Sequence, residues 1–233
     1  MQPGQDARFI KDLFGSIAGT YDRANDAITF GFAHRWRDAL VRWSLAGPNS
    51  IVLDCATGTG DLAFDFEASG VNQVYGIDFT PQMIELAKRK NLARTGNIKF
   101  SVGDALHLDF DSRRFDVTSI AYGIRNVSDV SAALTEMARV TKSGGAVMIL
   151  ETGEIENPVM RWGIRFYFET VVPRLGGYIS GHRDAYEYLQ RTSGQFTSGQ
   201  KFCDFISNTG VFSSVTHRPL MGGASFLYKA VVK

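Results

Sequence analysis

The stretch Ile51-Val52-Leu53-Asp54-Cys55-Ala56-Thr57-Gly58-Thr59-Gly60-Asp61-Leu62-Ala63 determines the fold class of this chain. An apolar run leads straight into a glycine loop and then into a helical pattern, which is the order found in parallel α/β sheets. Glycine at such a turn lets the backbone bend tightly and approach a ligand, and a helix N-terminus stands behind it. The stretch therefore predicts a strand, loop and helix that bind a nucleotide.

The glycine loop alone does not choose the nucleotide, because Gly58-x-Gly60-x-x-Ala63 also fits a dinucleotide fingerprint and a bare turn has the same form. Two acids at the ends of the next strands narrow the choice. Asp78 ends the second strand, where a carboxylate accepts both hydroxyls of a ribose, and Asp104 follows the third, placed to accept from an adenine amino group. With Asp54 they fit a ligand that has a cationic amino-acid end, a ribose and an adenine. We therefore predict S-adenosylmethionine, with NAD as the alternative.

Outward from the glycine loop, short runs rich in Val and Ile alternate with helical patterns. Two helices, 6–18 and 34–45, precede the first strand and are joined by a polar segment. The region 157–190 holds seven aromatic residues, is too long for an ordinary connection, and is expected to form a cap. Ser143-Gly144-Gly145 is expected to end a helix and to turn the chain into the next strand. Expected strands are 50–55, 73–77, 98–102, 115–121, 146–151, 213–219 and 224–232, and expected helices between them are 61–68, 81–94, 130–141 and 198–208.

The composition indicates one ordinary globular domain and excludes several classes of function. Of 233 residues, 44% are hydrophobic and 21% are charged, and the net charge of +1 gives no reason to expect a nucleic acid. No apolar run approaches the roughly 20 residues that span a bilayer, and the N-terminus has no apolar signal core. The two cysteines, Cys55 and Cys203, favour a reducing cytoplasm, and no spacing of His, Cys or acids indicates a metal.

Four further segments are more specific than the glycine loop. They are Tyr21-Asp22-x-x-Asn25-Asp26-x-x-Thr29-x-Gly31-x-x-His34-Arg35-Trp36, Tyr122-Gly123-Ile124-Arg125-Asn126-Val127-x-Asp129, Val172-Pro173-Arg174-Leu175-Gly176-Gly177 and Asp184-Ala185-Tyr186-x-Tyr188-Leu189. With them the chain, from about residue 10 to its end, resembles the ubiquinone/menaquinone biosynthesis C-methyltransferases. That family consists of class I methyltransferases, which use S-adenosylmethionine.

The resemblance implies a Rossmann-like class I methyltransferase fold of the α/β class. Such a fold has a seven-stranded, mostly parallel sheet with an antiparallel last strand, helices on both faces and a helical cap insertion. We expect a single methyltransferase domain over 1–233. Its parts are an N-terminal helical cap (1–48), a cofactor-binding core (49–152), a helical and aromatic insertion (153–197) and a C-terminal helix with a pair of strands (198–233).

The cofactor site joins the glycine loop to strand-end residues. Three positions depart from the family: Thr57 stands where a glycine is frequent, Ala121 where some members have a serine that contacts the cofactor, and Tyr228 where a histidine is frequent. The last departure leaves the identity of the quinone open. The expected cofactor-binding residues are Tyr21, Asp54, Gly58, Thr59, Gly60, Asp78, Asp104, Ala105 and Ala121, of which the resemblance implies Thr59, Asp78, Asp104 and Ala105.

Methylation of carbon needs a nucleophilic carbon, which a hydroquinone provides when one phenol loses its proton. Arg125, just past the fourth strand, is expected to stabilise the phenolate, and Asn126 to hold the substrate oxygen or a water. An ion pair between Arg125 and Asp129 is the structural alternative. Tyr21 and Asp22 are expected to cover the methionine end of the cofactor, or else only to pack a helix end.

The aromatic insertion either packs a cap helix on the sheet or walls an apolar pocket for a prenylated ring. In the second case the expected pocket residues are Tyr122, Arg125, Trp162, Phe166 and Tyr186, with Arg161 and Arg165 near a membrane surface. A polyprenyl substrate resides in the bilayer, so a protein without a spanning segment has to dock on it transiently.

We predict S-adenosylmethionine-dependent C-methylation of a prenylated hydroquinone, with demethylmenaquinone favoured over the benzoquinone precursor. The alternatives are a methyltransferase of the same fold that acts on another small aromatic compound, and a non-catalytic scaffold subunit of a quinone-biosynthesis complex. Expected partners are the quinol, the inner face of the membrane reached from the cytoplasm and, as one option, a second copy of the chain. No nucleic acid is expected.

Overall fold

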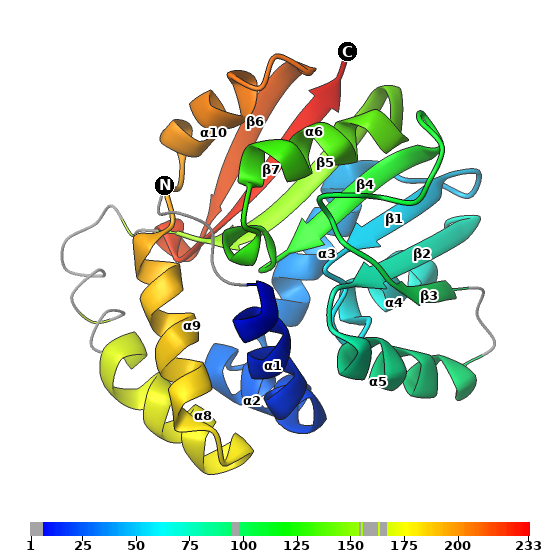
Figure 1. Cartoon of the computed structure of the whole chain (residues 1–233). Coiled ribbons are helices and arrows are strands. Elements are labelled where there is room, and N and C mark those ends of the chain that lie inside the picture. Colours follow the sequence, from blue (N-terminus) through cyan, green and yellow to red (C-terminus); the bar gives the residue numbers. More distant parts are fainter. Residues whose placement is uncertain (1–6, 95–97, 154, 156–162, 164–166) are drawn as a thin grey trace.

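The computed structural model describes residues 7–94, 98–153, 155, 163 and 167–233, and its centre is one twisted sheet (Figure 1). The strands are β1 (Ile51–Cys55), β2 (Gln73–Asp78), β3 (Ile98–Val102), β4 (Phe115–Ala121), β5 (Thr141–Thr152), β6 (Phe212–Leu220) and β7 (Ser225–Val232). Their order in the sheet is β3-β2-β1-β4-β5-β7-β6, with β1 to β5 parallel and β7 antiparallel to β5. β6 pairs antiparallel with β7 at the edge. The expected seven-stranded sheet with an antiparallel last strand is confirmed.

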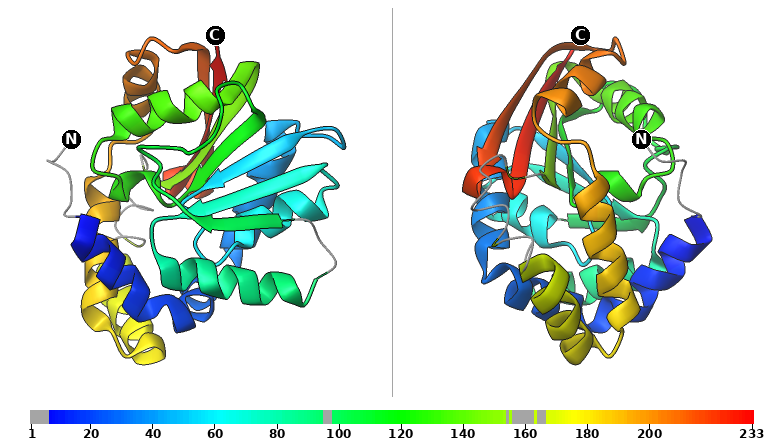
Figure 2. Two further views of the ribbon diagram at one scale, coloured as in Figure 1. Left: turned by 45° about the vertical axis from the view of Figure 1, so that its right-hand side comes forward. Right: turned by 90° about the vertical axis from the view of Figure 1, so that its left-hand side faces the viewer.

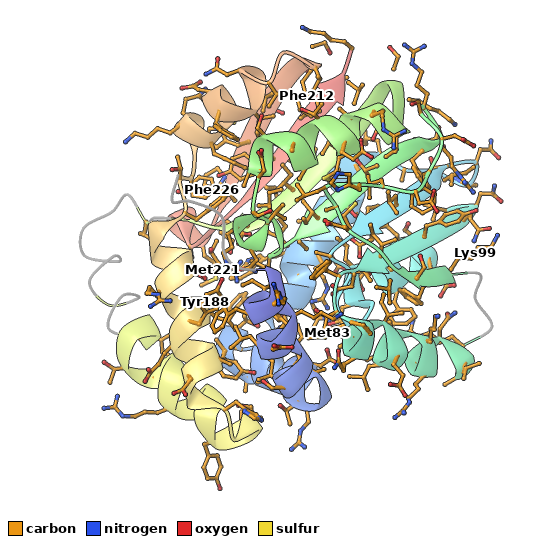
Figure 3. All side chains as sticks on the ribbon, in the orientation of Figure 1. Met83, Lys99, Tyr188, Phe212, Met221 and Phe226 are labelled. Carbon is orange, nitrogen blue, oxygen red and sulfur yellow. The ribbon has the colours of Figure 1, made fainter. Side chains whose placement is uncertain are left out.

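Helices cover both faces of the sheet. α3 (Phe32–Ser44), α4 (Asp61–Ala68) and α5 (Pro81–Leu92) pack on one face, and α6 (Val130–Val140) and α10 (Gln200–Ser207) on the other. Side chains fill the space between the helices and the sheet (Figure 3). The central strands β1 and β4 are therefore buried on both sides, including the polar residues Asp54, Thr118 and Ser119.

A helical cap stands at the end of the sheet where the parallel strands finish (Figure 2). It combines α1 (Ala7–Ile17), η1 (Ala18–Thr20) and α2 (Tyr21–Thr29) with η3 (Tyr167–Val171), α8 (Val172–Ser180) and α9 (Arg183–Gln195). This cap has a core of its own, made of Ile17, Ala24, Ile28, Val172, Ala185 and Tyr186. The cap helices before and after the parallel strands thus form one unit.

Two local expectations were wrong. The polar segment between the first two expected helices is the helix α2, which buries Ala24 and Ile28 and ends at Thr29, where Phe30 follows with a left-handed φ of 49°. Burial in the cap outweighs the weak helix propensity of this Asn- and Asp-containing stretch. The second error concerns 143–145, which lies inside β5 because α6 already ends at Val140. Pairing slips between β4 and β5 there, so these residues form a bulge in which Gly144 has a φ of 76°.

Candidate active site

Asp54 holds the glycine loop in place through hydrogen bonds. It lies in β1, is 1% exposed, and accepts hydrogen bonds from the hydroxyls of Thr57 (2.6 Å) and Ser119 (2.8 Å). Burial raises the pKa of Asp54 to about 7, and the two hydrogen bonds work against that rise. Because each carboxylate oxygen is held by a hydroxyl of the chain, Asp54 ties the loop after β1 to β4.

Asp78, the last residue of β2, also forms a hydrogen bond with the glycine loop. One carboxylate oxygen accepts from the backbone N–H of Gly58 (2.9 Å), and the other accepts from the backbone N–H of Thr80 (2.8 Å). Burial raises the pKa of Asp78, and these hydrogen bonds lower it. Each carboxylate oxygen can accept a further hydrogen bond, so Asp78 can still receive ligand hydroxyls.

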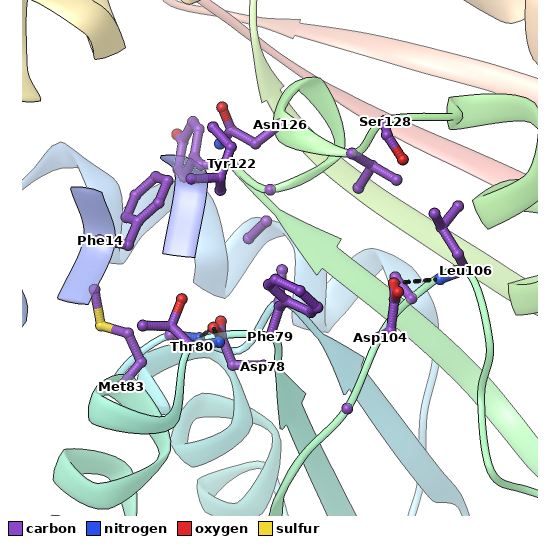
Figure 4. Close-up of a pocket in the computed structure, with 18 of the residues that line it drawn as sticks. Phe14, Asp78, Phe79, Thr80, Met83, Asp104, Leu106, Tyr122, Asn126 and Ser128 are labelled. Atoms are coloured by element: carbon purple, nitrogen blue, oxygen red, sulfur yellow. Dashed lines mark hydrogen bonds between the residues drawn. The ribbon is translucent and has the colours of Figure 1, made fainter. Parts of the chain in front are cut away.

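A crevice of about 130 Å³ lies at the carboxyl ends of the parallel strands. Figure 4 shows Asp78 and Asp104 along its floor, Phe14 of α1 on one side, and Tyr122 with Asn126 opposite the acids. The expected cofactor-binding residues that line it are Tyr21, Gly58, Asp78, Asp104, Ala105 and Ala121. Asp54, Thr59 and Gly60, which were also expected to bind the cofactor, are not among the residues that line it.

Hydrogen bonds and ion pairs among Asp22, Thr59, Asp61 and Lys90, which we call the polar clasp, connect the cap to the glycine loop. The Thr59 hydroxyl donates to Asp22 of α2 (2.5 Å) and accepts from Lys90 of α5 (2.9 Å). Lys90 also forms ion pairs with Asp22 (2.5 Å) and Asp61 (3.1 Å). Asp22 of the cap is therefore hydrogen-bonded to Thr59 of the glycine loop, and this contact holds the cap over the crevice.

A second cavity, of about 300 Å³, lies between the cap and the end of β4. We call this second cavity the acceptor cavity. Tyr21 and Tyr122 line it as well as the crevice, and we call these two residues the shared wall. The rest of its lining is mostly aromatic and aliphatic and includes Ile28, Phe32, Trp36, Tyr167, Val172 and Leu189. Of the expected pocket residues, Tyr122, Arg125 and Tyr186 line it, whereas Trp162 and Phe166, like Arg161 and Arg165, lie outside the described residues.

Tyr122 reaches the shared wall through an unusual backbone conformation. Its φ of 55° is left-handed, which costs energy in a residue with a bulky side chain. The next residue has to be glycine, since a Cβ at Gly123 would lie 2.6 Å from the Cβ of Ala56. Close packing of the loops after β1 and β4 therefore restricts the backbone beside Tyr122, and the Tyr122 hydroxyl lies within hydrogen-bond distance (3.3 Å) of the Ser225 hydroxyl.

Arg125 provides a buried cation in the acceptor cavity. It belongs to the turn η2 (Ile124–Asn126), its side chain is 7% exposed, and it forms an ion pair with the fully buried Glu151 at the end of β5. The alternative pairing with Asp129 is wrong, because Asp129 caps α6 by accepting from the N–H of Ala132 (2.9 Å). A buried guanidinium needs such a partner. Glu151 was missed, although an acid that closes the apolar run of β5 was a visible signal.

Asn126, adjacent to Arg125 in sequence, faces the crevice. Its side-chain oxygen accepts from the Tyr188 hydroxyl of α9 at 3.4 Å. The two residues expected to act in catalysis thus lie on opposite sides of the shared wall. Arg125 points into the acceptor cavity and Asn126 lines the crevice.

Tyr228, which departs from the family pattern, lies in the core between β7 and α10. Its ring packs on Phe202, and its oxygen accepts from the N–H of Gly199 at 2.8 Å. Among the described residues there is no group of three or more metal-ligating side chains, and no helix is long and apolar enough to cross a membrane.

The strand order and the crevice at the strand ends define a class I methyltransferase fold. A solved S-adenosylmethionine-dependent methyltransferase of Thermotoga maritima, described as a possible histamine N-methyltransferase, matches with a TM-score of 0.67 at 17% identity, over 96% of this chain and 99% of its own. The [4+2]-cyclase SpnF also matches with a TM-score of 0.67, at 14% identity and over 99% and 98% of the two chains. Such distant likeness establishes the fold alone.

The chain belongs to the ubiE/COQ5 methyltransferase family, whose model matches residues 1–232. It is 41% identical over 225 residues to the ubiquinone/menaquinone biosynthesis C-methyltransferase UbiE of Bdellovibrio bacteriovorus, with 96% of each chain covered. It is 36% identical over 202 residues to a demethylmenaquinone methyltransferase of Deinococcus radiodurans, covering 86% of this chain and 84% of the relative. The family and the fold class expected from the sequence are confirmed.

Proposed function

We propose that this chain transfers the methyl group of S-adenosylmethionine to a ring carbon of a prenylated hydroquinone in menaquinone or ubiquinone biosynthesis. The shared wall carries the proposal, because Tyr21 and Tyr122 separate a crevice lined by two acids from a mainly apolar cavity that contains a buried cation. The names of the relatives, UbiE and demethylmenaquinone methyltransferase, support the class of acceptor. We favour demethylmenaquinone as the substrate.

The residues of the crevice fit S-adenosylmethionine. Gly58 has a φ of 57°, and a Cβ built there would meet no atom within 4 Å, so the loop leaves space beside its backbone for a ligand. Asp78 would accept the ribose hydroxyls and Asp104 the adenine amino group. Tyr21 would cover the methionine end. When bound, the cofactor supplies an electrophilic methyl group on a sulfonium.

Arg125 would promote deprotonation of the substrate phenol. A guanidinium held by Glu151 in a cavity of low dielectric stabilises a phenolate and so lowers the pKa of the substrate phenol. Loss of that proton raises the electron density on the neighbouring ring carbon, so this carbon would be nucleophilic toward a methyl donor held in the crevice. Asn126, held by Tyr188, would position a substrate oxygen or a water at the crevice side. The cap over both cavities would exclude bulk water from the transfer.

The rim of the acceptor cavity supports transient contact with the inner face of a membrane. Phe30 and Met221 line this cavity, are 73% and 44% exposed, and both have left-handed backbones with φ of 49° and 45°. Two strained turns thus hold apolar side chains outward where a prenyl tail would enter. The double substitution of Phe30 and Met221 by Ser should lower co-sedimentation with phospholipid vesicles, and equal binding would reject this contact. A homodimer stays a prediction for sedimentation analysis.

A methyl-transfer assay with labelled S-adenosylmethionine tests the proposal. Purified protein would be mixed with reduced demethylmenaquinone and, separately, with the demethylated benzohydroquinone precursor, each in detergent micelles. Label is expected in the menaquinone precursor, and Arg125→Ala should lower turnover while cofactor affinity stays nearly unchanged. Label in neither quinol, with cofactor binding confirmed by calorimetry, would reject quinol methylation and favour another acceptor or a scaffold role.

A further inference from the structure

The acceptor cavity is lined by two cations, and carboxylates of the chain balance both of them. Arg125 forms an ion pair with Glu151. Arg37 of α3 forms ion pairs with Asp65 (2.8 Å) and Asp61 (3.4 Å). The side chains of Arg125 and Arg37 are only 7% and 9% exposed, so solvent screens these charges weakly. Among the described residues that line the cavity there is no carboxylate, histidine or lysine, so the cavity carries little net charge.

Tyrosines are the other titratable groups that face the cavity or the ion pair of Arg125 with Glu151 within the described chain. Burial raises the pKa of each, so their hydroxyls stay protonated and neutral. The acids of the crevice, Asp78 and Asp104, lie on the other side of the shared wall. No group in the described lining can therefore take the proton of a bound phenol, which has to leave to water. The tyrosines are Tyr21, Tyr122, Tyr167, Tyr186, Tyr188 and Tyr228.

Glu151 is held in the site by four hydrogen bonds from two residues. Its Oε1 accepts from Nη1 of Arg125 and from the backbone N–H (2.8 Å) and the hydroxyl (3.2 Å) of Thr152, which lines the cavity. Its Oε2 accepts from the backbone N–H of Arg125 at 3.4 Å. The carboxylate is fully buried, so its charge acts on the cavity with little screening. Glu151 thus orients the guanidinium and also offsets most of its charge.

Taking the proposed function as its basis, we propose that Glu151 is a positioning residue that keeps a bound hydroquinone protonated until a positively charged methyl donor occupies the crevice. Nη1 of Arg125 donates to Glu151 and Nε is enclosed, which leaves Nη2 to donate to a phenol oxygen. The balanced pair by itself has little net charge with which to stabilise a phenolate. Methyl transfer requires the donor methyl at about 3–3.5 Å from the carbon beside that oxygen. A sulfonium at such close range supplies the missing positive charge.

The charge balance makes the state of the phenol depend on the state of the cofactor. While the donor is cationic, the phenol loses its proton to water and the neighbouring ring carbon becomes nucleophilic. The ring carbon gains the methyl group as the S–C bond breaks, then loses its hydrogen as a proton to water, and the oxygen takes up a proton again. The spent cofactor is neutral, so the product stays protonated. A neutral quinol enters an apolar bilayer at lower cost than its anion does.

An absorbance titration of a bound phenol tests the inference separately from turnover. The probe is a prenylated naphthol with one hydroxyl and a fluorine on the accepting carbon, which blocks methyl transfer. The pKa of the naphthol bound to the wild type should be roughly 1–2 pH units lower with S-adenosylmethionine than with S-adenosylhomocysteine. In Glu151→Gln this pKa should be lowered by a similar amount with S-adenosylhomocysteine alone. Glutamine keeps an oxygen for the three hydrogen bonds to Oε1 but has no charge.

Asp116→Asn is the matched control. It removes the negative charge of an acid that is paired with Lys142 at the start of β4, whereas Arg125 follows the other end of that strand. This control should leave the pKa of the bound naphthol unchanged. If Glu151 served stability alone, Glu151→Gln would alter the free energy of unfolding and leave the pKa of the naphthol at its wild-type value.

Three results would overturn the inference: the same naphthol pKa with both cofactors in the wild type, an unchanged pKa in Glu151→Gln, or no binding of the naphthol to the wild type. The comparison of the two cofactors needs no variant, so it decides the matter even if Glu151→Gln does not fold. Methyl transfer to a quinol by a wild type without the pKa difference would leave the proposed function standing. The expected pKa differences with no label in either quinol would instead reject the proposed function alone.

Discussion

Replacement of Asp54 by Asn should remove a pH dependence of stability that the buried carboxyl imposes. Asp54 is fully enclosed between the glycine loop and β4, and burial raises its pKa from 3.8 to about 7. A carboxyl whose pKa is higher in the folded state binds more protons there than in the unfolded chain. Its stabilising contribution is therefore complete below pH 3.8 and is lost as the pH rises through about 7.

The size of the effect follows from that interval. At up to about 1.4 kcal/mol per pH unit, a carboxyl with these two pKa values lowers the free energy of unfolding by about 3 kcal/mol between pH 4 and pH 7, and by about 4 kcal/mol by pH 8. Asn has nearly the same shape and does not titrate. Its amide can still accept from one hydroxyl and donate to the other, because the hydroxyls of Thr57 and Ser119 can reverse roles.

Urea unfolding of the cofactor-free protein at several pH values between 4 and 8 measures this contribution. The stability of Asp54→Asn relative to the wild type should rise by about 4 kcal/mol from the acidic to the neutral end. Ser119→Ala removes a donor to the charged carboxylate and should extend the decline to higher pH. A stability difference between Asp54→Asn and the wild type that is the same at every pH would refute the reasoning.

Four further substitutions test the crevice and the residues around it. Asp78→Asn should weaken S-adenosylmethionine binding by roughly 1.5–3 kcal/mol in calorimetry, and unchanged affinity in a folded variant would reject the ribose contact. Gly60→Ala should lower the free energy of unfolding by about 2–4 kcal/mol, because φ is 93° and the new Cβ would lie 2.8 Å from the Phe100 ring. Gly58→Ala has open space and should cost only about 1 kcal/mol of strain, but should weaken cofactor binding; equal unfolding costs at the two glycines would contradict this. Lys90→Gln breaks two partly exposed ion pairs and should cost only about 1 kcal/mol, but should speed cofactor release in stopped-flow experiments; an unchanged release rate would show that Lys90 does not hold the cap over the crevice.

The parallel strands could be predicted from the sequence because short stretches rich in Val, Ile and Phe alternate with helical patterns. The run Ile51–Cys55 and the strand that ends at Asp78 were located to within a residue. α2 could not be predicted, since its helical state depends on burying Ala24 and Ile28 against α8 and α9, more than 140 residues away. The bulge at 143–145 was missed for a related reason, as the pairing of β5 with β4 decides it.

The candidate site divides in the same way. Asp78 and Asp104 were predictable, because parallel strands bring their ends to one edge. The pairing of Arg125 with Glu151 was not, since only the packed sheet sets these two residues side by side. The role of Asp54 also depended on the fold, because Ser119, which holds it, comes from β4. Sequence spacing located the acids but not the partners that satisfy them.

The core of the cap has a consequence for the order in which the molecule is made. Ile17 and Ile28 precede the first strand, whereas Val172 and Tyr186 follow the fifth. During synthesis the first two cap helices emerge long before the helices they pack against, and contacts of such wide sequence separation form slowly because loop closure costs entropy. The strand ends that line the crevice can therefore assemble before the later cap helices, which line the acceptor cavity, are in place. The nascent chain becomes able to recognise a methyl donor earlier than it becomes able to enclose an acceptor.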